Sequence, residues 1–437
     1  MNFDKLFSLA KEKGIEDLQI HYVKDNELEI EVFGKEVNKY SIASPSSLRV
    51  KGIYDGKMGT VSTEKIDDTM HDFIVDSIID SAKFIENNDE VFIYEGDDNY
   101  SLVEGLYNSK IEDIENTKKI NDTLELEKMV LAQDERVKMV QAFYGETKRD
   151  VVIKNSKGLD LKKTVNNAVF GAYVIASDGD DQRTGLEYIQ SNDYKDFNFE
   201  KMAKESAEKA CGLLGAGPCD SGEYEILLEN DASASLIAAY LSIFSAESVQ
   251  KDVSLLKGKL NTKIANDIIT LVDDPFMKKS VKSGSFDDEG VSTKYKEVVS
   301  KGVLTTYLHN LKTAKKDGIA STGNGYGNGI APSNLYIKPG KHKKEEVIAG
   351  INKGLLITSL AGLHSGANAI SGDFSLQATG YLIEAGKITS PVALITVAGN
   401  YLDLMNNVVG VCDDIKYNFN YIGSPSIHIK SLSVSGK

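Results

Sequence analysis

A long alternation of apolar and polar residues near the start of the chain most constrains how it can fold. In the stretch DLQIHYVKDNELEIEVFGKEVNKYSI, residues 17–42, Leu28, Ile30 and Val32 fall on one side of a period of two. Such alternation is typical of strands that bury one face. Together with the stretch SLRVKGIYDGKMGTVST that follows it, this pattern predicts an antiparallel meander.

The remaining N-terminal residues predict two α+β units, over residues 1–100 and 105–218. The expected elements, in order, are helices near 4–13, 67–86 and 117–134, strands within 137–177, and a helix near 199–214. The first unit is expected to end in the acidic stretch NNDEVFIYEGDDNY, residues 87–100. The stretch GAGPCDSGEY, residues 215–224, is the best linker candidate because glycine and proline punctuate it.

A third unit is expected over residues 221–437. It opens with a strand in YEILLEND, and ASLIAAYLSIFSAESV, residues 234–249, then predicts one helix with a buried stripe. The stripe consists of Leu236, Tyr240, Ile243 and Phe244. Short β-rich runs broken by glycines follow, which favours a curved or barrel-like sheet. The predicted fold class is therefore α+β, with N-terminal helix and antiparallel-sheet units before a larger β-rich, barrel-like domain.

Composition and charge exclude several classes of protein. The formal net charge of −15 argues against a nucleic-acid binder, which needs a basic face. No apolar run approaches the roughly 18 residues of a membrane span, and the first residues lack the apolar core of a signal peptide. Three cysteines are too few for a disulfide framework, and Cys211 and Cys412 are expected to be small core residues. A cytoplasmic protein is expected.

The residues offer no familiar catalytic motif. The six histidines do not share a helical face, and the sequence contains no Cys-x-x-Cys pair. The acidic groups Asp273–Asp274 and Asp287–Glu289 could perform acid–base work or bind a cation, but they could equally be solvated turns or caps on backbone amides. The stretch from His364 to Val392 looks like an active-site loop, so a hydrolase using His364 with Asp373 or Ser375 is one alternative.

Three blocks in the second half of the chain resemble the TldD/PmbA (TldD/TldE) family. They are SGSFDDEGVSTKYKEVVSKGVLTTYLHN (283–310), APSNLYIKPG (331–340) and the stretch from ISGDFSLQATG to VCDDI (370–415). The resemblance implies a cytosolic two-subunit peptidase whose subunits enclose a chamber and cut small or unfolded peptides. It also implies a zinc site in the TldD-type subunit, built from an H-E-x-x-x-H helix and a late cysteine, and none in the PmbA/TldE-type subunit.

This chain is similar to the PmbA/TldE type. The metal helix of the family falls on residues 238–244, which contain no histidine, and Glu247 comes several residues too late. The late cysteine would fall in YIGSPS, residues 421–426, which has none. The resemblance therefore implies no catalytic or metal-binding residue in this chain, with zinc in the partner subunit. Whether the chain is itself an enzyme stays open.

The leading hypothesis is a metal-free partner subunit of a TldD-type zinc peptidase. The alternative to a heterodimer is a homodimer that binds peptides without a peptidase partner. Neither nucleic acid nor membrane is an expected partner. The residues expected to border the peptide chamber or the subunit interface are His364, Gly372, Asp373, Phe374, Ser375, Asp288 and Glu289.

Overall fold

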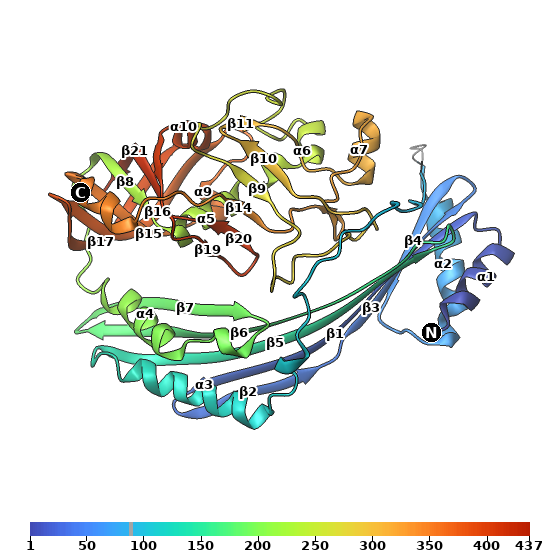
Figure 1. Cartoon of the computed structure of the whole chain (residues 1–437), viewed down its shortest axis with the longest axis horizontal. Coiled ribbons are helices and arrows are strands. Elements are labelled where there is room, and N and C mark those ends of the chain that lie inside the picture. Colours follow the sequence, from blue (N-terminus) through green and yellow to red (C-terminus); the bar gives the residue numbers. More distant parts are fainter. Residues whose placement is uncertain (87–90) are drawn as a thin grey trace.

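The computed structural model describes residues 1–86 and 91–437, and it shows an α+β protein as expected. Residues 87–90, with which the expected end of the first unit begins, lie outside the described residues. A long curved sheet occupies one side of the molecule and a β-rich C-terminal part occupies the other (Figure 1). No helix of the described residues is long and apolar enough to cross a membrane.

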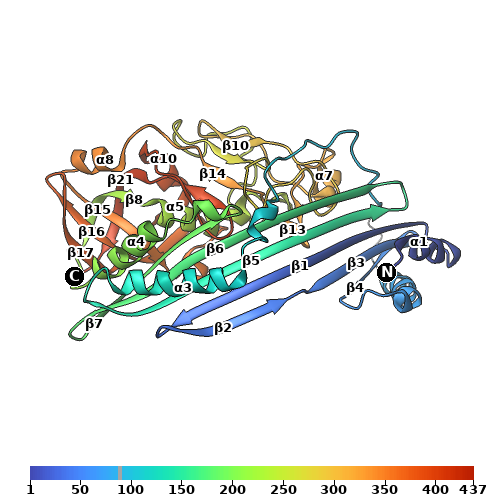
Figure 2. The same ribbon diagram turned by 60° about the horizontal axis from the view of Figure 1, so that its bottom comes forward.

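The long sheet is antiparallel throughout and has the order β4-β3-β1-β5-β6-β7. Its strands are β1 (Asp17–Phe33), β2 (Glu36–Ala43), β3 (Ser46–Tyr54), β4 (Lys57–Thr63), β5 (Val137–Asn155), β6 (Asp160–Asp178) and β7 (Asp181–Ser191). Strands β1, β5 and β6 run along most of the sheet (Figure 2). The expected simple meander is wrong in one respect, because β2 and β3 share one edge of β1 while β5 takes the other. Both N-terminal units thus contribute strands to a single sheet.

Helices cover the outer face of this sheet at both ends (Figure 1). They are α1 (Phe3–Glu12) and α2 (His71–Lys83) at one end, and α3 (Asn116–Leu131) and α4 (Phe199–Cys211) at the other. Leu28, Ile30 and Val32 of β1 are buried in the core beneath α3 and α4, which confirms the alternation read from the sequence. The opposite, concave face of the sheet is turned toward the C-terminal part.

The C-terminal part is built on a closed barrel of five strands, so the expected barrel-like domain is confirmed. They are β8 (Gly222–Leu228), β15 (Lys353–Ala361), β16 (Asp373–Glu384), β17 (Lys387–Asn400) and β21 (Ile427–Ser435). Closure comes from pairing of β17 with β21, for example Val397 with Val434. At Gly380 a Cβ would lie 1.9 Å from the carbonyl oxygen of Leu356, so only glycine permits this approach of β16 to β15.

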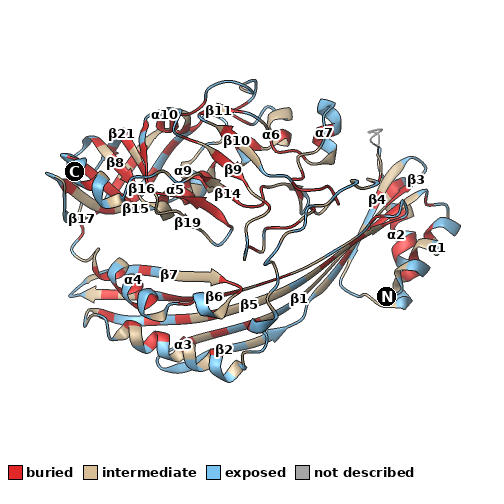
Figure 3. Ribbon diagram, viewed as in Figure 1, coloured by how far each residue is buried: buried red, intermediate tan, exposed pale blue. Residues whose placement is uncertain are grey.

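A second sheet packs beside the barrel, with the order β11-β10-β9-β14-β20-β19. Its strands are β9 (Leu271–Asp273), β10 (Lys296–Ser300), β11 (Val303–Leu304), β14 (Leu335–Ile337), β19 (Lys416–Tyr417) and β20 (Ile422–Ser424). The shorter elements are β12 (Gly325–Tyr326), β13 (Gly329–Ile330), β18 (Val408–Val411), α5 (Asn230–Ala239), α6 (Ala246–Gln250), α7 (Leu311–Asp317), α8 (Lys344–Gly350), α9 (Leu363–Gly366), α10 (Tyr401–Asn406), and the 3-10 turns η1 (Asp68–Met70), η2 (Ser109–Ile111), η3 (Tyr194–Asp196) and η4 (Leu241–Phe244). Buried residues gather where the barrel and this sheet meet (Figure 3).

Candidate functional site

The helix expected over residues 234–249 is interrupted. Helix α5 ends at Ala239, the 3-10 turn η4 follows, and α6 begins only at Ala246. A backbone bridge accounts for the interruption between η4 and α6, because the Leu308 amide donates to the carbonyl of Phe244 at 2.8 Å and the Ala246 amide donates to the carbonyl of Leu308 at 2.9 Å. This strand-like bridge uses backbone groups that a continuous helix would pair internally. One continuous helix was therefore wrong, whereas the predicted stripe is fully buried at Leu236, Tyr240, Ile243 and Phe244.

Tyr240, at the break, ties this segment to the start of β16. Its hydroxyl donates to the carbonyl oxygens of Gly372 at 3.0 Å and Asp373 at 2.9 Å. Its ring stacks on Tyr401 with 4.3 Å between centroids, and the Tyr401 amide also donates to Gly372 at 2.7 Å. Burial raises the pKa of Tyr240 to about 12, so the phenol stays protonated and serves as a donor. The loop before β16 is thus fixed from two sides.

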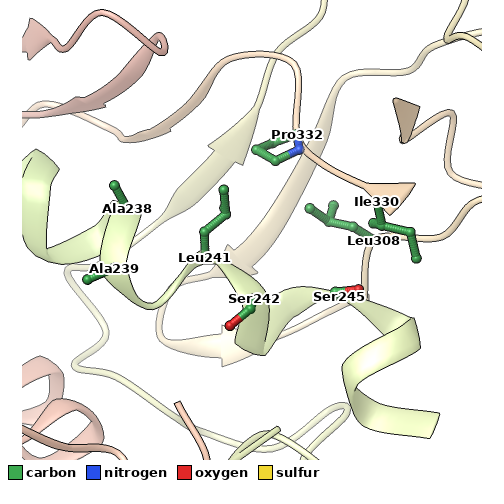
Figure 4. A pocket seen from close by; sticks show the side chains of 8 residues that line it. All are labelled: Ala238, Ala239, Leu241, Ser242, Ser245, Leu308, Ile330 and Pro332. Carbon is green, nitrogen blue, oxygen red and sulfur yellow. The ribbon is translucent and has the colours of Figure 1, made fainter. Parts of the chain in front are cut away.

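A pocket of about 280 Å³ lies at the break (Figure 4). Small and apolar side chains with two hydroxyls form its wall: Ala238, Ala239, Leu241, Ser242, Ser245, Leu308, Ile330 and Pro332. Leu241 extends toward Pro332, and Leu308 lies beside Ile330 (Figure 4). No ionisable side chain is among the described residues of this wall. The pocket is therefore electrically neutral.

The residues around the pocket do not fit the zinc site that the resemblance implies for a TldD-type subunit. Helix α5 packs against β20, which lies within YIGSPS. The hydroxyls of Ser233 and Ser424 lie 2.7 Å apart there, with Ser233 five residues before the 238–244 segment. Glu247 points elsewhere and pairs with Lys251 at 2.7 Å near the surface. Over residues 1–86 and 91–437, no group of three or more His, Cys, Asp or Glu is placed to hold a metal ion.

The loop that looked like an active site does not bring its candidate catalytic residues together. His364 is exposed on α9, while Asp373 and Ser375 lie on the exposed side of β16. Within the part of the chain that the structure describes, His364 makes no hydrogen bond or ion pair with either residue. Asp373 instead accepts from the Asn400 side chain at 3.0 Å, a bond that lowers the pKa of Asp373.

The other two candidates from this loop, Phe374 and Gly372, have structural roles. Phe374 points into the barrel core. Gly372 has φ of +85°, a conformation that favours glycine. The assignment of Gly372, Asp373, Phe374 and Ser375 to a chamber wall or interface stays a prediction.

Asp288 and Glu289 lie where the C-terminal part contacts the long sheet. Asp288 accepts from the Gly327 amide at 2.8 Å and approaches Nε2 of His21 on β1 at 3.6 Å. Burial alone would raise the pKa of Asp288, but the contact with His21 and the Gly327 amide hold it at about 2. Glu289 accepts from the Leu311 amide at 2.7 Å, and burial raises its pKa. These two carboxylates join their own loop to the β12–β13 hairpin, to helix α7 and to strand β1.

The neighbouring Asp287 caps three backbone amides. It accepts from Glu289 at 2.9 Å, Val291 at 3.0 Å and Gly325 at 2.8 Å, and no part of it is exposed. Asp273 is equally buried and bonds Ser333 and Lys296. Of the sequence-based alternatives, caps on backbone amides are confirmed for Asp287, and solvated turns are wrong for both aspartates.

The sequence matches two domain models of one family. The PmbA/TldA metallopeptidase central domain matches residues 109–214, and the C-terminal domain of the same family matches residues 221–436. The chain belongs to the PmbA/TldD metallopeptidase family. A structure from Thermotoga maritima, named as a candidate modulator of a DNA gyrase, superposes with a TM-score of 0.92 and 34% identity over 99% of each chain.

Two further comparisons agree with this membership. A metalloprotease PmbA homolog of Haemophilus influenzae is 26% identical over 92% of this chain and 88% of its own length. TldE from Thermococcus kodakarensis has the same fold, with a TM-score of 0.91 at 23% identity, covering 99% of this chain and 100% of its own.

For this PmbA/TldD chain, sequence reasoning missed three of the eight residues that line the pocket. Leu308, Ile330 and Pro332 come from segments more than 60 residues beyond α5. Leu308 lies in a short apolar run, Ile330 follows a glycine and Pro332 is a proline, and all three features also fit ordinary strands and turns. The Cys211 and Cys412 side chains are buried as expected, and burial raises the pKa of both thiols.

Proposed function

We propose that this chain is the subunit without a zinc site in a two-subunit PmbA/TldD-type peptidase of the cytoplasm. It completes the chamber in which a TldD-type partner, which carries the zinc, cuts small or unfolded peptides. The observation that carries the proposal is the segment from Ala238 to Phe244. At the place where the resemblance puts the metal helix, it offers a broken helix and a neutral pocket.

Physical chemistry supports the absence of metal chemistry at this position. A catalytic zinc needs three protein ligands with nitrogen, sulfur or carboxylate donors that converge on one point. Here the residues of the 238–244 segment that line the pocket contribute methyl groups, the Leu241 side chain and the hydroxyl of Ser242, and the nearby contact of α5 with β20 is between the hydroxyls of Ser233 and Ser424. Neutral hydroxyls are not among the ligands that usually hold zinc in proteins.

The concave face of the long sheet supports a role in enclosing a chamber. Phe33, Gln141, Tyr173 and Leu186 form one cross-strand row on β1, β5, β6 and β7. The three apolar members of the row are exposed by 44%, 40% and 36%. Exposed apolar side chains gathered on one face are typical of surfaces that contact another chain or a peptide. The concave face of the long sheet can therefore contact either a partner chain or a peptide.

Metal analysis of the chain purified alone, without chelators, tests the first half of the proposal. We expect far less than one zinc per chain and no hydrolysis of an unstructured peptide. The second half is tested by adding a TldD-type subunit, with which the chain should co-elute in size-exclusion chromatography and gain peptidase activity. One tightly held zinc per chain, or zinc-independent hydrolysis by the chain alone, would overturn the proposal.

A further inference from the structure

The pocket at the break between α5 and η4 excludes charged ligand groups. Charged residues make up 26% of the sequence, yet the eight side chains that line the pocket include none. An ionised group placed there would lose its hydration and gain no counter-ion, which is costly. The wall around Leu241, Leu308 and Ile330 instead favours an apolar group, because burying apolar surface is favourable in proportion to its area.

The pocket has room for a single side chain. Its volume of about 280 Å³ is at the lower end of the roughly 300–1,000 Å³ of most small-molecule sites. Ala238 and Ala239 each contribute only a methyl group to the wall. The pocket can therefore receive one side chain of leucine or phenylalanine size.

Two features beside the pocket suit an extended peptide backbone. Ile330 belongs to the β12–β13 hairpin, whose β12 side bonds Asp287 and Asp288 through Gly325, whereas among the described residues no strand pairs with its β13 side. A free strand edge can pair with an extended peptide, whose alternate side chains then enter pockets. The hydroxyls of Ser242 and Ser245 also make no hydrogen bond to another described residue, so both can bond a peptide group.

We propose that this pocket binds one uncharged apolar side chain of an extended peptide, so that the subunit selects peptides by a leucine- or phenylalanine-like residue. The selection rests on the proposed function, in which this subunit forms part of the peptide chamber. Through this pocket, the subunit without a metal site would contribute directly to substrate selectivity.

The test uses the full chain with ¹³C-labelled methyl groups of leucine and isoleucine. Blocked tripeptides Ac-Gly-Xaa-Gly-NH₂, with leucine, phenylalanine, glycine, aspartate or lysine in the centre, are titrated in. The leucine and phenylalanine peptides should shift the methyl signals of Leu241, Leu308 and Ile330. The glycine, aspartate and lysine peptides should bind at least tenfold more weakly.

Variants locate the binding. Ala238→Leu should fill the pocket and weaken the leucine peptide at least tenfold, while Ala349→Leu, the same change at an exposed position of α8, should have no effect. Ser242→Asp, at an exposed position of the wall, should reverse the preference toward the lysine peptide. Urea midpoints check that each variant is folded.

The outcomes separate this inference from the proposed function. Equal binding of all five peptides, or no shift at Leu241, Leu308 and Ile330, would overturn the inference. If the assembled peptidase keeps its substrate selectivity with Ala238→Leu, the pocket inference is refuted, whereas the proposed partner role is not affected. Selective binding by a chain that never assembles with a TldD-type subunit would support the pocket and refute the partner role.

Discussion

Replacing Asp288 by asparagine should weaken the contact between the C-terminal part and the long sheet by about 2 kcal/mol at neutral pH. Asparagine keeps an oxygen that can accept from the Gly327 amide, so the change removes mainly the charge beside His21. The pKa of Asp288 is lowered from 3.8 to about 2 in the folded protein. Each unit of this difference corresponds to about 1.4 kcal/mol, which gives the stated loss.

The sign of the pH dependence follows from the direction of this shift. Because the folded-state pKa is below the unfolded one, the stabilisation is complete above about pH 4 and is lost as the pH falls toward 2. Urea unfolding of the wild type and of Asp288→Asn from pH 7 down to 3 would measure it. The difference in unfolding free energy between the two proteins should shrink below about pH 4. The control Asp98→Asn, at an exposed aspartate nearby, should show no difference from the wild type at any pH. A constant difference at all pH values would refute a role of the charge.

Three further changes probe other parts of the molecule. Burial and the charge of Glu289 raise the pKa of Asp287 from 3.8 to about 7, so its contribution to the free energy of unfolding is complete below about pH 4 and is lost as the pH rises through 7. Asp287→Asn should reduce this fall in unfolding free energy with pH, measured by urea titrations. A fall equal to that of the wild type would contradict this. Lys119→Met should lower the free energy of unfolding by about 3–5 kcal/mol, because Lys119 is 2.5 Å from Glu146 and both side chains are largely buried. Adding Glu146→Leu should recover part of this loss, and a double variant whose loss equals the sum of the single losses would argue against the pairing. Asp373→Ala should leave the urea midpoint unchanged but weaken assembly with a TldD-type subunit or peptide processing, and normal assembly and processing would remove Asp373 from the proposed surface.

Local pattern was sufficient for several elements of the fold. Alternation correctly placed Leu28, Ile30 and Val32 inside, since a strand that buries one face must alternate. The helical spacing of Leu236, Tyr240, Ile243 and Phe244 also marked buried residues, even though the helix breaks at Tyr240. A second interruption follows between η4 and α6, where Phe244 and Ala246 form a backbone bridge to Leu308, and no pattern within residues 234–249 encodes that bridge.

The pKa values of two neighbouring carboxylates also could not be predicted from local sequence. Asp287 and Asp288 are adjacent in sequence, yet the pKa of one is raised to about 7 and that of the other is lowered to about 2. Burial and the charge of Glu289 raise the pKa of Asp287, whereas Asp288 contacts the Gly327 amide and His21, a residue of β1 that lies more than 260 positions earlier. Sequence alone gives both residues the same ordinary behaviour.

The sequence by itself determined which faces of the strands and helices are apolar and the α+β class, and it shows no histidine in residues 238–244 and no cysteine in residues 421–426. Only the tertiary structure decided that β1 pairs with β5 to form one long sheet, that β17 closes the barrel on β21, and that Leu308 and Ile330 complete a neutral pocket. The physical reason is that composition and periodicity are local properties of the chain. Pairing, closure and cavities depend instead on which distant segments reach one another, and that is settled by the packing of the whole molecule.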